Sequence, residues 1–140
     1  NTIKQAEKEV DLLIVSIHWG AEYQPYPVKW QRELAHKMID AGADLIVGNH
    51  PHWVEPIEIY KEKLIIYAHG NFIFDQEWSK ETKTGYVVKI TFLQKRIIDI
   101  QLFPVLISDY NQTEFLQREE KEKVLKDLKN RSITIQKASQ

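Results

Sequence analysis

The 140-residue sequence contains no cysteine, which excludes disulfide bonds and thiolate metal sites. It also has no apolar run that approaches the length of about 18 residues needed for a membrane-spanning helix. Its charges nearly cancel, because 19 Lys and Arg stand against 20 Asp and Glu for a net charge of −1. No strong electrostatic field is therefore available to attract nucleic acid or an anionic membrane, and neither is an expected partner.

Two catalytic devices are also missing. No glycine-rich phosphate loop of either standard pattern is present. Ser16 lies inside an expected strand without a foreseeable acid–base partner, so a serine nucleophile has little support. The chain opens without a signal-peptide pattern, because Asn1 leads directly into a polar, helix-like stretch at residues 2–10. We expect this chain to be a piece of a longer protein.

The composition is that of a globular protein, with 43% apolar and 28% charged residues. The length suits one domain and is too short for two ordinary ones. No internal repeat or linker divides the chain. We therefore expect residues 1–140 to form part of a single domain, with a core at 11–105 and a surface helix and tail at 113–140.

A strand–helix–strand unit is predicted in the first third of the chain. Residues 11–17 (DLLIVSI) are a nearly continuous apolar run, which is typical of a strand buried on both faces. Apolar residues then recur at helical spacing over 28–41, and Gly42 provides the helix stop. A second buried strand follows at 44–47. The spacing predicts a parallel βαβ unit, whose carboxyl strand ends form the expected ligand-binding edge.

The remaining pattern changes from parallel to antiparallel character. Alternating residues predict a hairpin over 86–93 and 97–103, and Pro104 is expected to end it. The other expected elements are strands at 54–60 and 63–67, a polar loop at 76–84, a surface helix at 114–130 and a ten-residue tail. The fold class is thus α/β, as half of an α/β/β/α sandwich with a mixed sheet, one βαβ unit and a C-terminal antiparallel hairpin.

Three histidines follow the two strands of the βαβ unit: His18, His50 and His52. In the His50-Pro51-His52 segment, alternate side chains of an extended backbone would point the same way, and Pro51 favours that geometry. Imidazole suits zinc, manganese, iron or nickel. Because both strand ends open on the same crevice, we predict that the three imidazoles form a metal site, with Gly48 allowing a sharp turn before them.

Nearby polar residues have both functional and structural interpretations. Glu22 and Asp75 are the closest carboxylates, and each suits either orientation of a ligand imidazole or a position in a surface loop. His69 is a candidate ligand for which capping of a loop is the more common role. His36 lies within the expected helix and is predicted to be structural or solvent-facing.

Aromatic residues flank the expected crevice, namely Trp19, Tyr23 and Trp53. Stacking on a substrate and packing beside a buried strand both account for them, and packing is the more common role. The residues that we predict to contact substrate or to support the metal ligands are Trp19, Glu22, Asn49, His69 and Asn71.

Three segments together resemble the last three signatures of the bacterial capsule-synthesis (CapA-type, poly-γ-glutamate biosynthesis) family. They are residues 18–23 (HWGAEY), 42–52 (GADLIVGNHPH) and 67–75 (YAHGNFIFD). Their order and spacing match the family over about two thirds of the chain. The sequence departs from the pattern at His69, where members usually carry Leu, and at Asn49, where His is common. Neither departure removes a proposed ligand.

The family in turn resembles the calcineurin-like metallophosphoesterases, and this resemblance implies roles for the histidines. His18 matches the lone metal-binding histidine of the fourth superfamily motif, while His50 and His52 match the final pair, one for each metal of a dinuclear site. Nothing in this chain matches the first three motifs, which supply the bridging carboxylate and the general acid. We therefore expect the C-terminal half of the domain, holding half of a site that is catalytically silent alone.

The resemblance implies a capsule or poly-γ-glutamate biosynthesis protein with a divalent transition metal (Mn, Zn or Fe), dinuclear in the full-length protein and weak or absent here. Phosphoryl or acyl hydrolysis or transfer is the implied chemistry, on an anionic polymer or phosphorylated substrate. The alternative is a non-catalytic polymer-binding or scaffolding subunit of a synthesis and export complex. A membrane anchor with this domain at the cell surface is implied, and an exposed sheet predicts homodimerisation.

Overall fold

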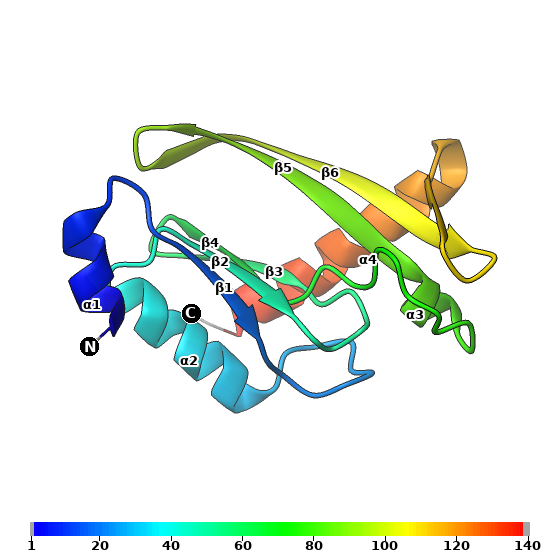
Figure 1. Cartoon of the computed structure of the whole chain (residues 1–140), viewed down its shortest axis with the longest axis horizontal. Helices are drawn as coiled ribbons and strands as arrows, with labels where there is room; N and C mark the ends of the chain where they lie inside the picture. Colours follow the sequence, from blue (N-terminus) through cyan, green and yellow to red (C-terminus); the bar gives the residue numbers. More distant parts are fainter. Residues whose placement is uncertain (1, 139–140) are drawn as a thin grey trace.

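The computed structural model describes residues 2–138, and its first two strands form a parallel βαβ unit with the helix between them (Figure 1). Strand β1 (Ile14–His18) is followed by helix α2 (Lys29–Asp40) and by strand β2 (Leu45–Asn49). The two strands are parallel neighbours, with His18 opposite Asn49. Gly42 adopts a φ of +114° directly after α2, a conformation that glycine tolerates and that ends the helix. The predicted βαβ unit is confirmed.

Two further strands complete a mixed sheet with the order β1-β2-β4-β3. Strand β4 (Lys63–Ile66) is parallel to β2, and β3 (Ile57–Tyr60) is antiparallel to β4. Lys61 and Glu62 join β3 to β4 with φ values of 48° and 63°. Two successive left-handed residues match the twist of a tight hairpin, as their polar sequence predicts.

A second, antiparallel sheet covers one face of the first (Figure 1). It consists of β5 (Thr84–Leu93), β6 (Arg96–Ser108) and β7 (Gln112–Phe115), in that order. The two sheets enclose an apolar cluster that includes Leu45, Leu64, Ile66 and Tyr86. The opposite face of the mixed sheet packs against α2 and the N-terminal helix α1 (Thr2–Ala6), which continues into the 3-10 turn η1 (Glu7–Glu9). The predicted α/β class, with its mixed sheet and antiparallel hairpin, is confirmed.

Helix α4 (Arg118–Lys137) connects both apolar clusters and closes one sheet edge. Leu128 packs in the cluster between the sheets, and Ile135 packs in the cluster beneath α2. Near its C-terminus, the Gln136 amide pairs with the backbone of Ile59, donating to its carbonyl oxygen at 2.9 Å and accepting from its N–H at 3.0 Å. The Ser132 hydroxyl accepts from the N–H of Ile57 at 2.9 Å. These side chains occupy the outer edge of β3 as a neighbouring strand would.

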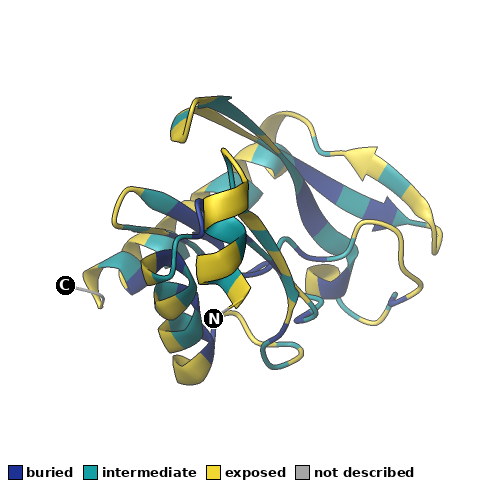
Figure 2. Cartoon of the chain, turned by 60° about the vertical axis from the view of Figure 1, so that its left-hand side comes forward, coloured by how far each residue is buried: buried dark blue, intermediate teal, exposed yellow. Residues whose placement is uncertain are grey.

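The expectation that residues 11–17 are buried on both faces is wrong. Strand β1 begins at Ile14, and its residues alternate between exposed and half-buried. Ile14 is 47% exposed, whereas Ile46 on the neighbouring strand is 0% exposed. The reason is position, because β1 forms a sheet edge and the second sheet packs over β2 and β4 instead. Figure 2 shows burial concentrated in the strands and the inner side of α2, with the turn between β5 and β6 exposed.

The C-terminal third differs from the prediction in three places. Pro104 does not end the hairpin, because β6 continues to Ser108. A proline has no N–H to donate, but its carbonyl still takes part in pairing and accepts from the N–H of Leu116 at 2.9 Å. The polar loop at 76–84 contains the short helix α3 (Lys80–Lys83). The segment at 112–115 forms β7, so the helix begins at Arg118 and runs through most of the predicted tail; residues 139–140 lie outside the described residues.

No helix within residues 2–138 is both long and apolar enough to cross a membrane.

Candidate metal centre

The loops that follow β1 and β2 lie side by side at the carboxyl edge of the mixed sheet. Two backbone hydrogen bonds join them: the N–H of Trp19 donates to the carbonyl of Asn49 at 3.0 Å, and the N–H of Tyr23 donates to the carbonyl of Pro51 at 2.9 Å. Gly48 lets the carbonyl of Tyr67 and the indole of Trp19 lie close to its backbone, because a Cβ there would collide with both. The absence of a side chain at Gly48 thus permits a close approach of neighbouring groups, whereas the sequence analysis predicts that it permits a sharp turn.

Three imidazoles gather where these loops leave the sheet. The ring centroids of His18 and His50 are 4.5 Å apart, and those of His50 and His52 are 6.0 Å apart. The structure therefore brings together the three histidines that the sequence singles out. Their role as metal ligands stays a prediction.

The backbone that carries His50 and His52 is a turn, so the prediction of an extended two-residue clamp is wrong. The φ angles of His50 and His52 are 102° and 61°. The turn lets the carbonyl of Pro51 accept from Tyr23, and the Asn49 side chain accepts from the N–H of His50 at 3.0 Å. A non-glycine residue in this region costs about 1–3 kcal/mol, and such strain is concentrated at functional sites.

The carboxylate of Glu22 completes a three-residue group with two of the histidines. Its Oε1 lies 4.0 Å from Nε2 of His50 and 4.0 Å from Nε2 of His52. One donor atom from each of the three residues falls within 4.8 Å of the others. Donor atoms around a tetrahedral zinc lie roughly 3.4 Å apart. Because the Glu22 side chain is 46% exposed, it has room for this adjustment, and the group fits a divalent transition metal.

His52 is held on its edge and on its faces. Its Nδ1 lies 2.9 Å from Oδ1 of Asn71. The ring stacks against Tyr23, with centroids 5.8 Å apart and an interplanar angle of 23°, and Phe74 lies at 5.1 Å. With Nδ1 engaged, Nε2 is the nitrogen that faces Glu22. Such outer contacts are what orient a ligand imidazole in metal sites.

The other candidate residues lie outside this group. Trp19 is only 5% exposed, stacks on Tyr67 and donates its indole N–H to the carbonyl of that residue at 2.9 Å, which is the geometry of a packed core side chain. The side chain of Asn49 accepts from the backbone N–H of His50 and lies outside the group of three. His69 meets the aromatic ring of Tyr86 edge-on, and burial lowers its pKa.

Asp75 and His36 also lie outside the group formed by Glu22, His50 and His52. Asp75 is exposed and stands outside the group of three, whereas Glu22 belongs to it. His36 stacks on Tyr60 with centroids 3.9 Å apart, and its Nε2 lies 3.0 Å from the buried carboxylate of Glu58. Its predicted structural role is confirmed.

Sequence reasoning missed two residues that support the centre, Gln76 and Thr82. The Gln76 amide donates to the hydroxyl of Tyr23 at 3.2 Å and accepts from Asn71 at 3.2 Å. The backbone carbonyl of Thr82 accepts from Asn71 at 2.9 Å. Both lie in a segment whose polar composition predicts a loop, and only burial, at 7% and 0% exposure, distinguishes them from surface residues.

Comparison with known proteins places the same residues in a family context. The chain is 49% identical over 85 residues to the PGA biosynthesis protein CapA of Bacillus subtilis, which covers 61% of this chain and 22% of that protein. It is 40% identical over 99 residues to the capsule biosynthesis protein CapA of Bacillus anthracis, covering 71% of this chain and 24% of that protein. A probable polyglutamine synthesis accessory protein of Mycobacterium tuberculosis is 31% identical over 105 residues, 70% of this chain and 28% of that protein.

The chain thus spans about a quarter of the length of these curated relatives. The family model described as bacterial capsule synthesis protein PGA_cap matches residues 1–76. That segment contains all three sequence signatures and the candidate metal centre with its support from Asn71. It covers more than half of the 140 residues, and the chain therefore belongs to the bacterial capsule synthesis protein family.

Proposed function

We propose that this chain carries the histidine part of a divalent transition-metal site in a capsule or poly-γ-glutamate biosynthesis protein. Glu22, His50 and His52 would hold a manganese, zinc or iron ion, with His18 beside His50 as a ligand for a second ion. The observation that supports this proposal is the approach of one carboxylate oxygen to two imidazole Nε2 atoms, at 4.0 Å each.

Two independent features make an accidental cluster a poor explanation. The left-handed backbone of His50 is a local energetic cost that the fold retains. His52 is oriented by Asn71 through the nitrogen that points away from Glu22, which leaves the other nitrogen for a ligand. A surface cluster without a function needs neither feature.

A divalent ion at this position would supply Lewis acidity toward a phosphoryl or acyl oxygen. The chain's own residues would bind this ion and orient the imidazoles that hold it. Within residues 2–138 the group holds one carboxylate, that of Glu22, whereas a two-metal hydrolytic site requires further ligands to fix both ions. We therefore propose weak binding of an ion by the 140-residue chain alone and no turnover, with phosphoryl or acyl chemistry on an anionic polymer or phosphorylated substrate in the longer protein.

The competing proposal is a non-catalytic, polymer-binding subunit of a capsule synthesis and export complex, anchored in the membrane with this domain at the cell surface. It uses the same crevice for binding alone. A phosphatase screen of the longer protein, with and without added manganese, separates the two proposals. Metal-dependent turnover supports the enzyme, and metal binding without turnover supports the subunit.

Self-association is a separate proposal about the exposed flank of the sheets. Ile14 on β1 and Leu93, Ile98 and Ile100 around the hairpin turn are 38–62% exposed. Exposed apolar side chains of this kind favour contact with a second copy. Sedimentation velocity over a range of concentrations measures it, and a monomer at every concentration would contradict it.

Calorimetry with zinc tests the metal centre directly. Wild type should bind zinc, and the His50→Ala, His52→Ala double variant should not. Glu22→Gln should bind more weakly, because an amide is a poorer ligand than a carboxylate. His36→Gln is the matched control, since it removes an imidazole outside the centre while keeping a hydrogen-bonding group beside Glu58. Equal zinc affinity in wild type and the double variant would overturn the proposal, and robust phosphatase turnover by the 140-residue chain would overturn its incomplete-site reading.

A further inference from the structure

We propose that Asn71 is a positioning residue that fixes His52 as the Nδ1–H tautomer and thereby presents the Nε2 lone pair to the metal centre. The consequence for metal binding rests on the proposed function, whereas the tautomer is a property of the metal-free chain. The inference follows from which atoms of Asn71 can donate and which can only accept.

The orientation of the Asn71 amide is fixed by its other partners. Its Nδ2 donates to the backbone carbonyl of Thr82 at 2.9 Å and to Oε1 of Gln76 at 3.2 Å. A backbone carbonyl is an acceptor only, so the NH₂ group must face Thr82. The amide oxygen therefore faces His52, and Oδ1 lies 2.9 Å from Nδ1. Because an amide oxygen also only accepts, Nδ1 must carry the proton. In a neutral imidazole the lone pair then belongs to Nε2.

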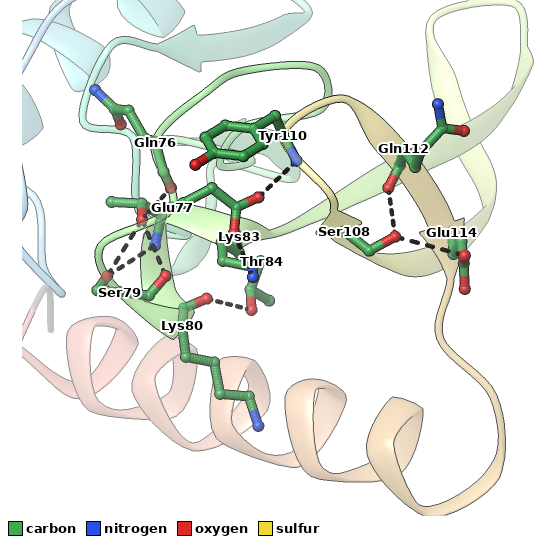
Figure 3. A network of polar contacts seen from close by, with 11 residues as sticks. Gln76, Glu77, Ser79, Lys80, Lys83, Thr84, Ser108, Tyr110, Gln112 and Glu114 are labelled. Atoms are coloured by element: carbon green, nitrogen blue, oxygen red, sulfur yellow. Dashed lines mark hydrogen bonds and ion pairs between the residues drawn. The ribbon is translucent and has the colours of Figure 1, made fainter.

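The partners of Asn71 are themselves immobilised around α3. Ser79 caps this short helix by accepting from the N–H of Thr82 at 3.1 Å, and the Thr82 hydroxyl donates to the carbonyl of Gln76 at 2.8 Å. Thr82 is fully buried. Figure 3 shows Glu77 between Lys83 and Tyr110, accepting from both, which ties the preceding loop to the turn between β6 and β7. The amide of Asn71 thus has a rigid support.

Gln76 links the edge contact of His52 to its face contact. Its Oε1 accepts from Asn71, which holds the ring edge, and its Nε2 donates to the hydroxyl of Tyr23, which stacks on the ring. Rotation of the His52 ring therefore requires both contacts to break. A single buried side chain couples the tautomer of His52 to its orientation.

The ring of the neighbouring His50 has no such contact with a side-chain amide among the described residues. The side chain of Asn49 accepts from the backbone N–H of His50 and not from its ring. Across residues 2–138, no side-chain amide contacts a ring nitrogen of His50 or His18. Among the three clustered histidines of the described residues, His52 is the one whose ring nitrogen is held by a side-chain amide.

Nuclear magnetic resonance of the metal-free protein reads the tautomer directly, through the nitrogen shifts of the His52 ring at a pH where it is neutral. Wild type should show a protonated Nδ1 and an unprotonated Nε2. In Asn71→Ala the preference for Nδ1–H should be lost. The ring should shift toward the Nε2–H tautomer, which neutral imidazole favours in water. The zinc affinity of this variant should fall about 10- to 100-fold, the typical effect of removing an outer-sphere partner of a ligand. Asn130→Ala is the matched control on the exposed face of α4.

Asn71→Asp distinguishes positioning of the tautomer from general structural support. A carboxylate still accepts from Nδ1–H but cannot donate to Thr82, so it should retain the tautomer and most of the zinc affinity. If Asn71→Ala fails to fold, this variant still carries the test. A His52 with Nε2–H in wild type, or a tautomer and affinity unchanged in Asn71→Ala, would overturn the proposal. The Nδ1–H form without zinc binding by wild type would support the tautomer assignment and overturn the metal centre instead.

Discussion

Nε2 of Gln31 donates a hydrogen bond to Oε2 of Glu55 at 2.9 Å, and both side chains are 0% exposed. The second oxygen of Glu55 has no hydrogen-bond partner among the described residues. Burial is the main cause that raises the pKa of Glu55 from its ordinary 4.5 to about 7, against the opposing effects of Gln31 and Arg131. Gln31 also accepts from the N–H of Val28 at 3.2 Å, so this pair anchors the start of α2 to the segment that precedes β3.

The raised pKa of Glu55 predicts a stability that falls as pH rises. The folded chain keeps a proton that the unfolded chain loses above about pH 4.5, so the stabilisation is complete below that pH. It disappears as pH rises through about 7, a loss of up to about 3 kcal/mol in the free energy of unfolding. Urea denaturation at several pH values between 4.5 and 8 measures it.

Glu55→Gln should remove this pH dependence, because the neutral amide keeps an acceptor for Gln31 without a titrating proton. At pH 8 the variant should be more stable than wild type. Glu33→Gln, which changes an exposed glutamate on α2, is the control and should leave the slope intact. The same slope in wild type and in Glu55→Gln would show that Glu55 does not govern the dependence.

His50→Gly should increase the stability of the metal-free fold while abolishing its zinc binding. Glycine relieves a left-handed backbone that costs a histidine about 1–3 kcal/mol, against a greater entropy of the unfolded chain of about 0.4–1 kcal/mol. His18→Gly, on strand β1, should instead destabilise. Thermal unfolding without metal compares the two, and equal losses in both variants would contradict the assignment of strain to His50.

Two isoleucines on the neighbouring strands β1 and β2 should differ in their contribution to stability. Ile46→Ala on β2 removes a fully buried side chain and should cost about 2–5 kcal/mol. Ile14→Ala on β1 removes one that is 47% exposed and should cost less than about 1 kcal/mol. Urea denaturation of both variants measures the loss in the free energy of unfolding. Comparable losses in the two variants would mean that the face of β1 is covered in solution.

Removing the side chain that closes β3 should cost stability and favour association. Gln136→Ala leaves the N–H and carbonyl of Ile59 without their partners. Water replaces them in part, so we expect a loss of about 1 kcal/mol. Sedimentation should show more association, because an open strand edge pairs with other chains. Gln101→Ala, on the exposed face of β6, is the control, and identical behaviour of both variants would contradict a protective role for Gln136.

Local patterns were sufficient to predict the βαβ unit and the hairpins. Helical spacing before Gly42 and the polar pair at Lys61 and Glu62 act within a few residues, so the sequence carries them directly. The burial of β1 could not be predicted, because an apolar run indicates what a strand can tolerate and not whether another layer covers it. The same limit applies to Pro104, which has no N–H to donate: whether the strand continues through it depends on the pairing of β6 with β5 and β7, which lie elsewhere in the chain.

The candidate site was predictable in its residue types and less so in its geometry. The strand-end positions of His18, His50 and His52 follow from the parallel arrangement of β1 and β2. The left-handed turn at His50 depends on hydrogen bonds to a different loop, and no local rule favours it. The roles of Gln76 and Thr82 arise from burial around α3, which a polar segment does not reveal.

The closure of β3 by α4 also sets an order of events during synthesis. Gln136 follows Ile59 by 77 residues along the chain. At a translation rate of about 5–20 residues per second, the ribosome needs roughly 4–15 s to make the intervening segment. Throughout that interval the nascent sheet has an unprotected edge. The growing polypeptide therefore carries an open strand edge, which pairs readily with other chains, before the last turns of α4 have emerged.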